Sequence, residues 1–237
     1  MKTKITQILK RMLHFFGRKY CRLICKSEFL SRRLKINERA VEYRFVFQSL
    51  AKTYPKTVLD IGTGISALPQ LMSNCGFMVT AIDNIKDYWP RGMFNRHYYV
   101  LNDDILSPGL QEKFNCITCV SVLEHINDHA KAVKKMLNLL EDGGYLILTF
   151  PYNENKYVAN AYEIDGSQKQ KNVPYVCQVF SRSQIGEWIG LDARIVEQEY
   201  WRFYNGEFWG VGEKLCPSRQ VGKNEQHDLT CLLIKKN

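Results

Sequence analysis

The stretch VLDIGTGIS, residues 58–66, decides the fold of this chain. It begins as an apolar strand and runs directly into a turn that contains two glycines. Glycine is needed where the backbone turns tightly and a ligand approaches it without a Cβ in the way. Gly62-x-Gly64-x-x-Ala67 also nearly satisfies the general dinucleotide fingerprint, so the two glycines alone do not select the ligand.

Asp60 helps to select it. A carboxylate two residues before the first glycine is poorly placed beside a pyrophosphate, which binds best in positive or neutral surroundings. It suits a ligand that carries positive charge, such as an ammonium or a sulfonium.

Apolar segments alternate with helical or turn stretches beyond this loop. A helix is expected from Asn37 through Leu50, and Pro55 ends it. This alternation indicates a parallel sheet with helices on both faces. The expected strands are 57–61, 78–82, 98–101, 116–122, 144–150, 194–200 and 229–235.

The loop resembles motif I of the class I S-adenosylmethionine-dependent methyltransferases, whose usual form is Asp-x-Gly-x-Gly-x-Gly. Ser66 stands in place of the third glycine. The resemblance implies an α/β, Rossmann-like, seven-stranded and mostly parallel sheet with helices on both faces and an antiparallel last strand. It also implies S-adenosylmethionine as the cofactor and no metal.

Further motifs follow in the order that this family has. Asp83 ends the second strand at close to the expected spacing of about 20 residues from the loop, and a carboxylate suits both ribose hydroxyls. After the third strand, Asp104 resembles the acceptor for the adenine amine, although Asp103 is an alternative, and Ile105 would pack on the ring. A helix is expected to end in a left-handed cap at Gly143-Gly144. The cofactor site implied by the resemblance is Asp60, Gly62, Thr63, Gly64, Asp83, Asn84, Asp104, Ile105 and Ser121.

The turn Leu123-Glu124-His125-Ile126 occurs in methyltransferases of small molecules and sugars. A neutral imidazole at His125 would remove the proton of an acceptor hydroxyl, and the alternative is a histidine that caps or packs below the site. Nucleic acid is not the expected substrate, because the chain lacks the Asn/Asp-Pro-Pro-Tyr/Phe turn of base-methylating enzymes after the fourth strand.

Acceptor contacts are expected from two insertions, 151–180 and 202–228. Residues 200–209 include six aromatic residues. They are interpreted either as a sugar-stacking surface or as a small satellite core. The chain looks most like small methyltransferases of surface-polysaccharide clusters. The expected reaction is therefore O-methylation of a glycan or glycolipid hydroxyl. A quinone-like or other small-molecule acceptor, and a non-catalytic cofactor-binding regulatory subunit, are the alternatives.

Residues 1–35 form a basic arm that precedes the methyltransferase domain, residues 36–237. The arm carries eleven Lys or Arg and one acid, a net charge of +10, whereas 36–237 carry 22 basic and 23 acidic side chains. Its apolar residues recur at helical spacing. Such a helix can lie on an anionic membrane surface, pack on its own domain, or contact nucleic acid.

Eight cysteines do not indicate a disulfide framework, because Cys116, Cys119 and Cys231 fall within apolar strand-like runs. The Cys116/Cys119 pair lacks the second pair that a zinc site needs. We find no signal peptide and no run of the roughly 18 apolar residues that a spanning helix requires. A cytoplasmic protein is expected, with the arm allowing a peripheral position at the inner face of the membrane.

Overall fold

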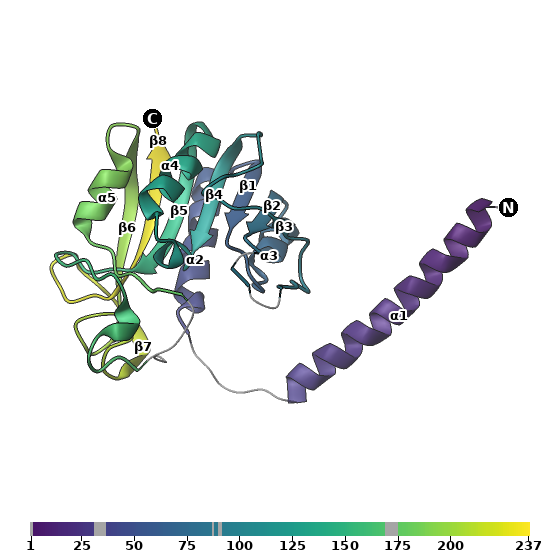
Figure 1. The fold of residues 1–237 in the computed structure, drawn as a ribbon, viewed down its shortest axis with the longest axis horizontal. Coiled ribbons are helices and arrows are strands. Elements are labelled where there is room, and N and C mark those ends of the chain that lie inside the picture. Colours follow the sequence, from purple (N-terminus) through teal and green to yellow (C-terminus); the bar gives the residue numbers. More distant parts are fainter. Residues whose placement is uncertain (1, 31–36, 87, 90–91, 169–174) are drawn as a thin grey trace. The chain divides into compact units, whose positions relative to one another are not determined.

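The structure of the protein is a computed structural model, which describes residues 2–30, 37–86, 88–89, 92–168 and 175–237. Two compact units are present, Met1–Asn37 and Glu38–Asn237 (Figure 1). The second unit holds the sheet and the candidate site, and the described residues of the first contain one helix.

The larger unit is built on one eight-stranded sheet of order β3-β2-β1-β4-β5-β8-β6-β7. The first five strands run parallel, and β8 is antiparallel to both β5 and β6. The expected Rossmann-like α/β sheet, mostly parallel with an antiparallel last strand, is confirmed. The strands are β1 (Thr57–Ile61), β2 (Met78–Asp83), β3 (Leu101–Asn102), β4 (Phe114–Val120), β5 (Leu140–Pro151), β6 (Ala193–Tyr204), β7 (Lys214–Val221) and β8 (Leu229–Lys236).

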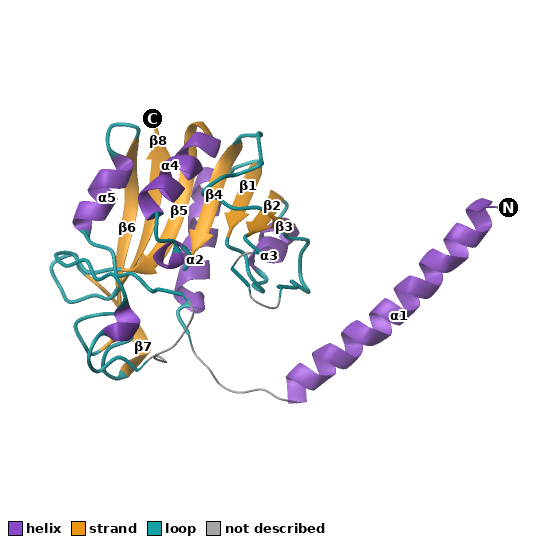
Figure 2. Ribbon diagram, viewed as in Figure 1, coloured by secondary structure: helices purple, strands orange, loops and turns teal. Residues whose placement is uncertain are grey.

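Helices cover both faces of this sheet (Figure 2). On one face, α4 (His129–Leu139) and α5 (Arg182–Ile189) pack on a cluster that includes Leu59 and Ile117. On the other, α2 (Arg39–Thr53) and α3 (Leu68–Asn74) pack on the cluster that includes Val58. Successive residues of each strand pack alternately into these two clusters, because side chains of a strand point to opposite faces of the sheet in turn. Two short 3₁₀ helices complete the unit, η1 (Leu123–His125) and η2 (Ala161–Glu163).

Three details of the expected strands are wrong. The third strand is only Leu101–Asn102, because the side-chain oxygen of Asn95 accepts from the backbone N–H groups of His97 and Tyr98 and holds that segment in a turn. The sheet has an eighth strand, β7, at its edge. This strand is half exposed and contains Pro217, a residue that suits only edge strands, so it lacks the apolar alternation of a core strand.

The third correction concerns the junction of α4 and β5. The helix ends at Leu139, and Leu140 is already extended, so the glycine pair lies inside β5 instead of capping the helix. Gly143 does adopt a left-handed conformation, with φ of 76°. A Cβ on Gly144 would lie 2.8 Å from the carbonyl oxygen of Glu141, so the pair serves a tight bend at the start of the strand.

The cysteines of the larger unit pack as small apolar residues. Cys116 and Cys119 are both fully buried on β4, but they belong to the core clusters on opposite faces of the sheet. All eight cysteines lie in the part of the chain that the structure describes, and none of them forms a disulfide bond. Two side chains on opposite faces of one strand cannot share an ion.

The smaller unit is the helix α1 (Lys2–Leu30), which continues without a break through Gly17. Its large apolar side chains are exposed, including Leu13 and Phe16. Among the helices that the structure describes, none is long and apolar enough to cross a membrane.

Candidate functional site

A cavity of about 860 Å³ opens at the edge of the sheet where the parallel strands β1, β2 and β4 end. Ligands of open α/β sheets bind at this edge, just beyond the carboxyl ends of the strands. Nearly all residues expected at the site line this one cavity. They are Gly62, Thr63, Gly64, Asp83, Asn84, Asp104, Ile105, Ser121 and His125.

The glycine loop forms one wall of the cavity. Gly62 and Gly64 both have left-handed backbones, with φ of 69° and 53°. A Cβ on Gly62 would overlap the side chain of Val122, which follows β4. The backbone N–H of Gly62 donates to the carbonyl oxygen of Ile82 at 2.9 Å, which ties the loop to β2. The loop is therefore a backbone cradle that only glycine can form.

Asp83, the last residue of β2, faces this loop. Its Oδ2 accepts from the backbone N–H of Gly64 at 2.7 Å, and its Oδ1 accepts from the indole N–H of Trp89 at 2.9 Å. The Trp89 ring also lies beside Gly64. The carboxylate thus has a fixed orientation at the cavity wall, and each of its oxygens retains a further lone pair.

Two acids follow β3, and they have different partners. The Asp103 carboxylate accepts from the backbone N–H groups of Asp104 and Gly109, so it organises its own loop. Asp104 uses one oxygen to accept from the backbone N–H of Leu106 at 2.9 Å. The next residue, Ile105, is almost fully buried and presents apolar surface to the cavity.

Asp60 is the one expected cofactor residue that does not line the large cavity. It is buried beneath the loop and borders a small adjoining hollow of about 20 Å³. Its carboxylate accepts from the hydroxyls of Thr118 and Thr63 at 2.6 and 2.7 Å. Burial raises the pKa of Asp60 to about 6, against the opposing effect of these two hydrogen bonds.

A buried carboxylate on α2 connects this helix to the end of β4. Glu42 is fully buried and accepts from the hydroxyls of Ser121 and Thr149 at 2.5 and 2.7 Å. It also pairs with Arg39 at 2.9 Å. Arg39 donates in addition to the carbonyl oxygen of Val120 at 3.2 Å. This network holds Ser121 in its left-handed conformation, with φ of 51°, at the cavity wall.

His125, in η1, has a defined tautomer. Its Nδ1 lies 2.6 Å from the carbonyl oxygen of Val176, and a carbonyl can only accept, so Nδ1 carries the proton. The other nitrogen, Nε2, therefore has a free lone pair. Burial lowers the pKa of His125, which keeps the ring neutral near pH 7. The ring of Tyr175 packs edge-on against the imidazole, with centroids 5.0 Å apart.

Glu124 lies next to this histidine and is buried. Its Oε1 is 3.9 Å from Nε2 of His125, too far for a hydrogen bond. Within the described part of the chain, Oε2 has no hydrogen-bond partner. Burial raises the pKa of this carboxyl to about 8, so the protonated, neutral form is favoured at pH 7.

The two insertions differ in what they contribute. Tyr175, from 151–180, lines the cavity, and residues 169–174 of that segment lie outside the described residues. None of the residues 202–228, all of which the structure describes, lines it. The aromatic side chains of 200–209 are buried or half-buried within the core clusters, which matches a satellite core and not an exposed sugar-stacking surface.

Several residues of the cavity wall were not singled out from the sequence, among them Arg39, Tyr43, Tyr88, Trp89 and Tyr175. Arg39 and Tyr43 are four residues apart on α2 and so share one face of that helix. Tyr88 packs on Tyr175 with centroids 5.8 Å apart, which joins two segments distant in the chain. The helical spacing of Arg39 and Tyr43 is a weak sequence signal that they act together. Nothing in the local sequence indicates that Tyr88 and Tyr175 meet.

Fold and site together define a class I methyltransferase domain, a class whose cofactor is S-adenosylmethionine. The residues present fit this group: a backbone cradle that a Cβ would fill, an acid at the end of β2, and apolar surface from Ile105. The chain belongs to the family described as the methyltransferase domain, whose model matches residues 31–191.

Individual relatives agree with this membership. The "Ubiquinone biosynthesis O-methyltransferase" of Coxiella burnetii (strain Dugway 5J108-111) is 30% identical over 145 residues, which cover 56% of this chain and 61% of the relative. The chain spans about half to three-fifths of the length of the curated relatives it matches.

Two solved structures share the fold. The 1,6-didemethyltoxoflavin-N1-methyltransferase of Burkholderia thailandensis aligns with a TM-score of 0.56 at 13% identity, covering 94% of this chain and 90% of that one. The N-methyltransferase NodS of Bradyrhizobium japonicum aligns with a TM-score of 0.51 at 16% identity, covering 84% and 87%.

Proposed function

We propose that this protein methylates a hydroxyl of a small aromatic acceptor, a phenol or quinol, and uses S-adenosylmethionine as the methyl donor. The observation that carries the proposal is the position of His125. His125, whose Nε2 is unprotonated, lines the same cavity as Tyr175, Tyr88 and the glycine loop.

The proposed cofactor site uses the chain's own groups in separate roles. The backbone of Gly62, Thr63 and Gly64 would accommodate the methionine part, and Arg39 would supply positive charge for its carboxylate. Asp83, assisted by Asn84, would accept from the ribose hydroxyls. Ile105 would pack on the adenine, and Asp104 would accept from its amine. Asp60 acts from beneath the loop, through Thr63 and through its charge, and Ser121 closes the wall at β4.

The cofactor supplies an activated methyl group on a sulfonium, so the protein has to position the acceptor and remove one proton. His125 is suited to accept the proton that the acceptor hydroxyl loses. Its Nδ1–H is held by Val176, which fixes the ring and directs Nε2 as the acceptor. Because burial lowers its pKa, the imidazole is free to act as a general base at neutral pH. Glu124, buried beside it, adds no negative charge while it remains protonated.

The aromatic wall favours a planar acceptor. Tyr88, Tyr175 and His125 form consecutive ring contacts with centroids 5.8 and 5.0 Å apart, and aromatic rings pack on such walls in offset or edge-on geometry. The relatives named "Ubiquinone biosynthesis O-methyltransferase" support this acceptor class by the O-methylation and the quinone in that name. A glycan or glycolipid hydroxyl, which the sequence favoured, loses one of its supports because the aromatic residues of 200–209 pack inside the fold.

The test is turnover with a panel of acceptors. Purified protein is incubated with S-adenosylmethionine and either short-chain catechols, hydroquinones, or oligosaccharides, and S-adenosylhomocysteine is quantified by mass spectrometry. The proposal expects a methylated phenolic product. Methylation of oligosaccharides alone would restore the glycan acceptor. Cofactor binding without turnover on any acceptor would favour a non-catalytic regulatory subunit.

A further inference from the structure

We infer that α1 is a membrane-docking helix that lies in the interface of an anionic lipid bilayer. The inference rests on the proposed function to this extent: a phenolic acceptor with an apolar tail would reside in the same bilayer. The helix is treated by itself, from the side chains of residues 5–26.

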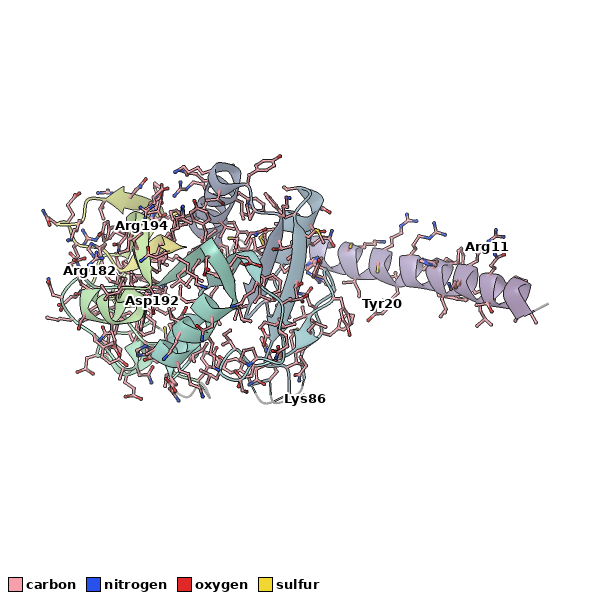
Figure 3. All side chains as sticks on the ribbon, turned by 90° about the horizontal axis from the view of Figure 1, so that it is seen from above. Arg11, Tyr20, Lys86, Arg182, Asp192 and Arg194 are labelled. Carbon is pink, nitrogen blue, oxygen red and sulfur yellow. The ribbon has the colours of Figure 1, made fainter. Side chains whose placement is uncertain are left out.

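One side of α1 is mainly apolar. Its large side chains recur at the three- and four-residue spacing that places them on one side of a helix, and they are 49 to 67% exposed. Figure 3 shows Tyr20, from this face, and Arg11 directed to opposite sides of the helix. The members of the apolar face are Ile5, Ile8, Leu9, Met12, Leu13, Phe15, Phe16, Tyr20 and Leu23.

The rest of the helix is basic. Residues 5–26 contain six Lys or Arg and no acid. Arg11, Arg18 and Arg22 occupy the polar side, whereas Lys19 falls within the angular range of the apolar face. Its ammonium lies 4.9 Å from the ring centroid of Phe15, the arrangement of a long basic side chain that covers apolar surface with its stem and keeps its charge outward.

An anionic lipid surface accounts for both features together. Its acyl boundary takes up the apolar face, and its negative headgroups attract the flanking charges. A nucleic acid would neutralise the charges but leave nine large apolar side chains in water, at a cost that grows with their area. The helix is not apolar enough to cross the bilayer, so it lies along the surface.

Docking of this kind would give the enzyme access to an acceptor that cannot leave the bilayer. A water-soluble acceptor would be methylated equally well with or without vesicles. A tailed acceptor would be methylated faster when α1 holds the enzyme at the surface, because binding to a common surface raises the effective concentration.

The experiment uses the full chain and three matched triple variants. The first replaces the apolar face, Leu9→Gln, Leu13→Gln and Phe16→Gln. The second replaces charge, Arg11→Gln, Arg18→Gln and Arg22→Gln. The control changes the middle of the polar side, Gln7→Ala, His14→Gln and Cys21→Ala. Flotation with vesicles of phosphatidylcholine, with and without phosphatidylglycerol, is measured at low and high salt. Circular dichroism checks that each variant is folded.

The wild type and the control should float with anionic vesicles and much less with neutral ones, and salt should weaken the binding. The charge variant should bind about a hundredfold more weakly, since each basic residue near an anionic surface contributes about fivefold. The apolar variant should bind at least about tenfold more weakly. Equal flotation of wild type and apolar variant, or no flotation of the wild type, would overturn the inference. Methylation of a soluble acceptor by all four proteins separates that outcome from failure of the proposed function.

Discussion

Replacing Asp83 with Asn is the perturbation that most clearly separates a cofactor site from a merely structural turn. The carboxylate accepts from Gly64 N–H at 2.7 Å and from the indole N–H of Trp89 at 2.9 Å. Asparagine keeps the shape but offers one oxygen and one NH₂ group. Whichever way the amide is turned, it directs a donor at one of these two donors.

The magnitude follows from these contacts. A hydrogen bond to a charged acceptor contributes about 1.5–3 kcal/mol, and a donor left unsatisfied costs about 1–3 kcal/mol. We expect the free energy of unfolding to fall by about 2–4 kcal/mol. The proposed bonds to the ribose hydroxyls lose their charge as well, which lowers cofactor affinity by about 2–3 kcal/mol, or roughly 30- to 150-fold.

Calorimetric titration with S-adenosylhomocysteine measures the affinity, and urea unfolding measures the stability. Asp192→Asn, an exposed position far along the chain, is the matched control and should leave both unchanged. An Asp83→Asn protein that is folded and binds within about twofold of the wild type would refute the assignment of Asp83, because that difference is worth less than 0.5 kcal/mol.

Three further changes test the site. Gly62→Ala places a Cβ against Val122 in a left-handed backbone, so urea unfolding should show a loss of about 2–4 kcal/mol, and a loss below about 0.5 kcal/mol would contradict the cradle. His125→Gln should reduce kcat by about 10²–10⁴-fold while calorimetry shows unchanged cofactor binding. In the wild type, kcat/KM should rise with pH through a pKa below 6.5 and then level off, and a profile with no acid limb would contradict a histidine base. Glu124 has a folded-state pKa of about 8 against a usual 4.5, so the folded state holds its proton more tightly and stability declines as pH rises between these values. Glu124→Gln should flatten that decline in melting temperature between pH 5 and 8. Wild-type and variant melting temperatures that fall in parallel with pH would contradict the raised pKa of Glu124.

The parts of the fold that could be predicted are those with a local chemical cause. The glycine loop and Asp83 are recognisable because a left-handed turn and a strand-terminal acid each require a particular residue type. Parallel pairing then brings the ends of β1, β2 and β4 to one edge, so the motifs meet although they are far apart in the chain. The third strand and β7 were mispredicted because a side-chain-capped turn and a polar edge strand lack apolar periodicity.

The rest of the site depends on tertiary packing. Arg39 reaches the cavity because the buried carboxylate of Glu42 anchors α2 to β4, and no pattern in residues 39–53 shows which face will do so. Tyr175 lies beside His125 through the contact of Val176 with Nδ1, a pairing across fifty-one positions. The burial of Glu124 has no signal in the sequence either, because a charged residue is usually exposed.

The most direct test of the central claim is a crystal structure of the protein grown with S-adenosylhomocysteine. We expect density for the ligand in the cavity at the ends of β1, β2 and β4, with the ribose on Asp83, the adenine beside Ile105 and the sulfur toward His125. Density at another place, or an affinity too weak to fill the cavity at saturating ligand, would contradict the assignment of this cavity as the cofactor site.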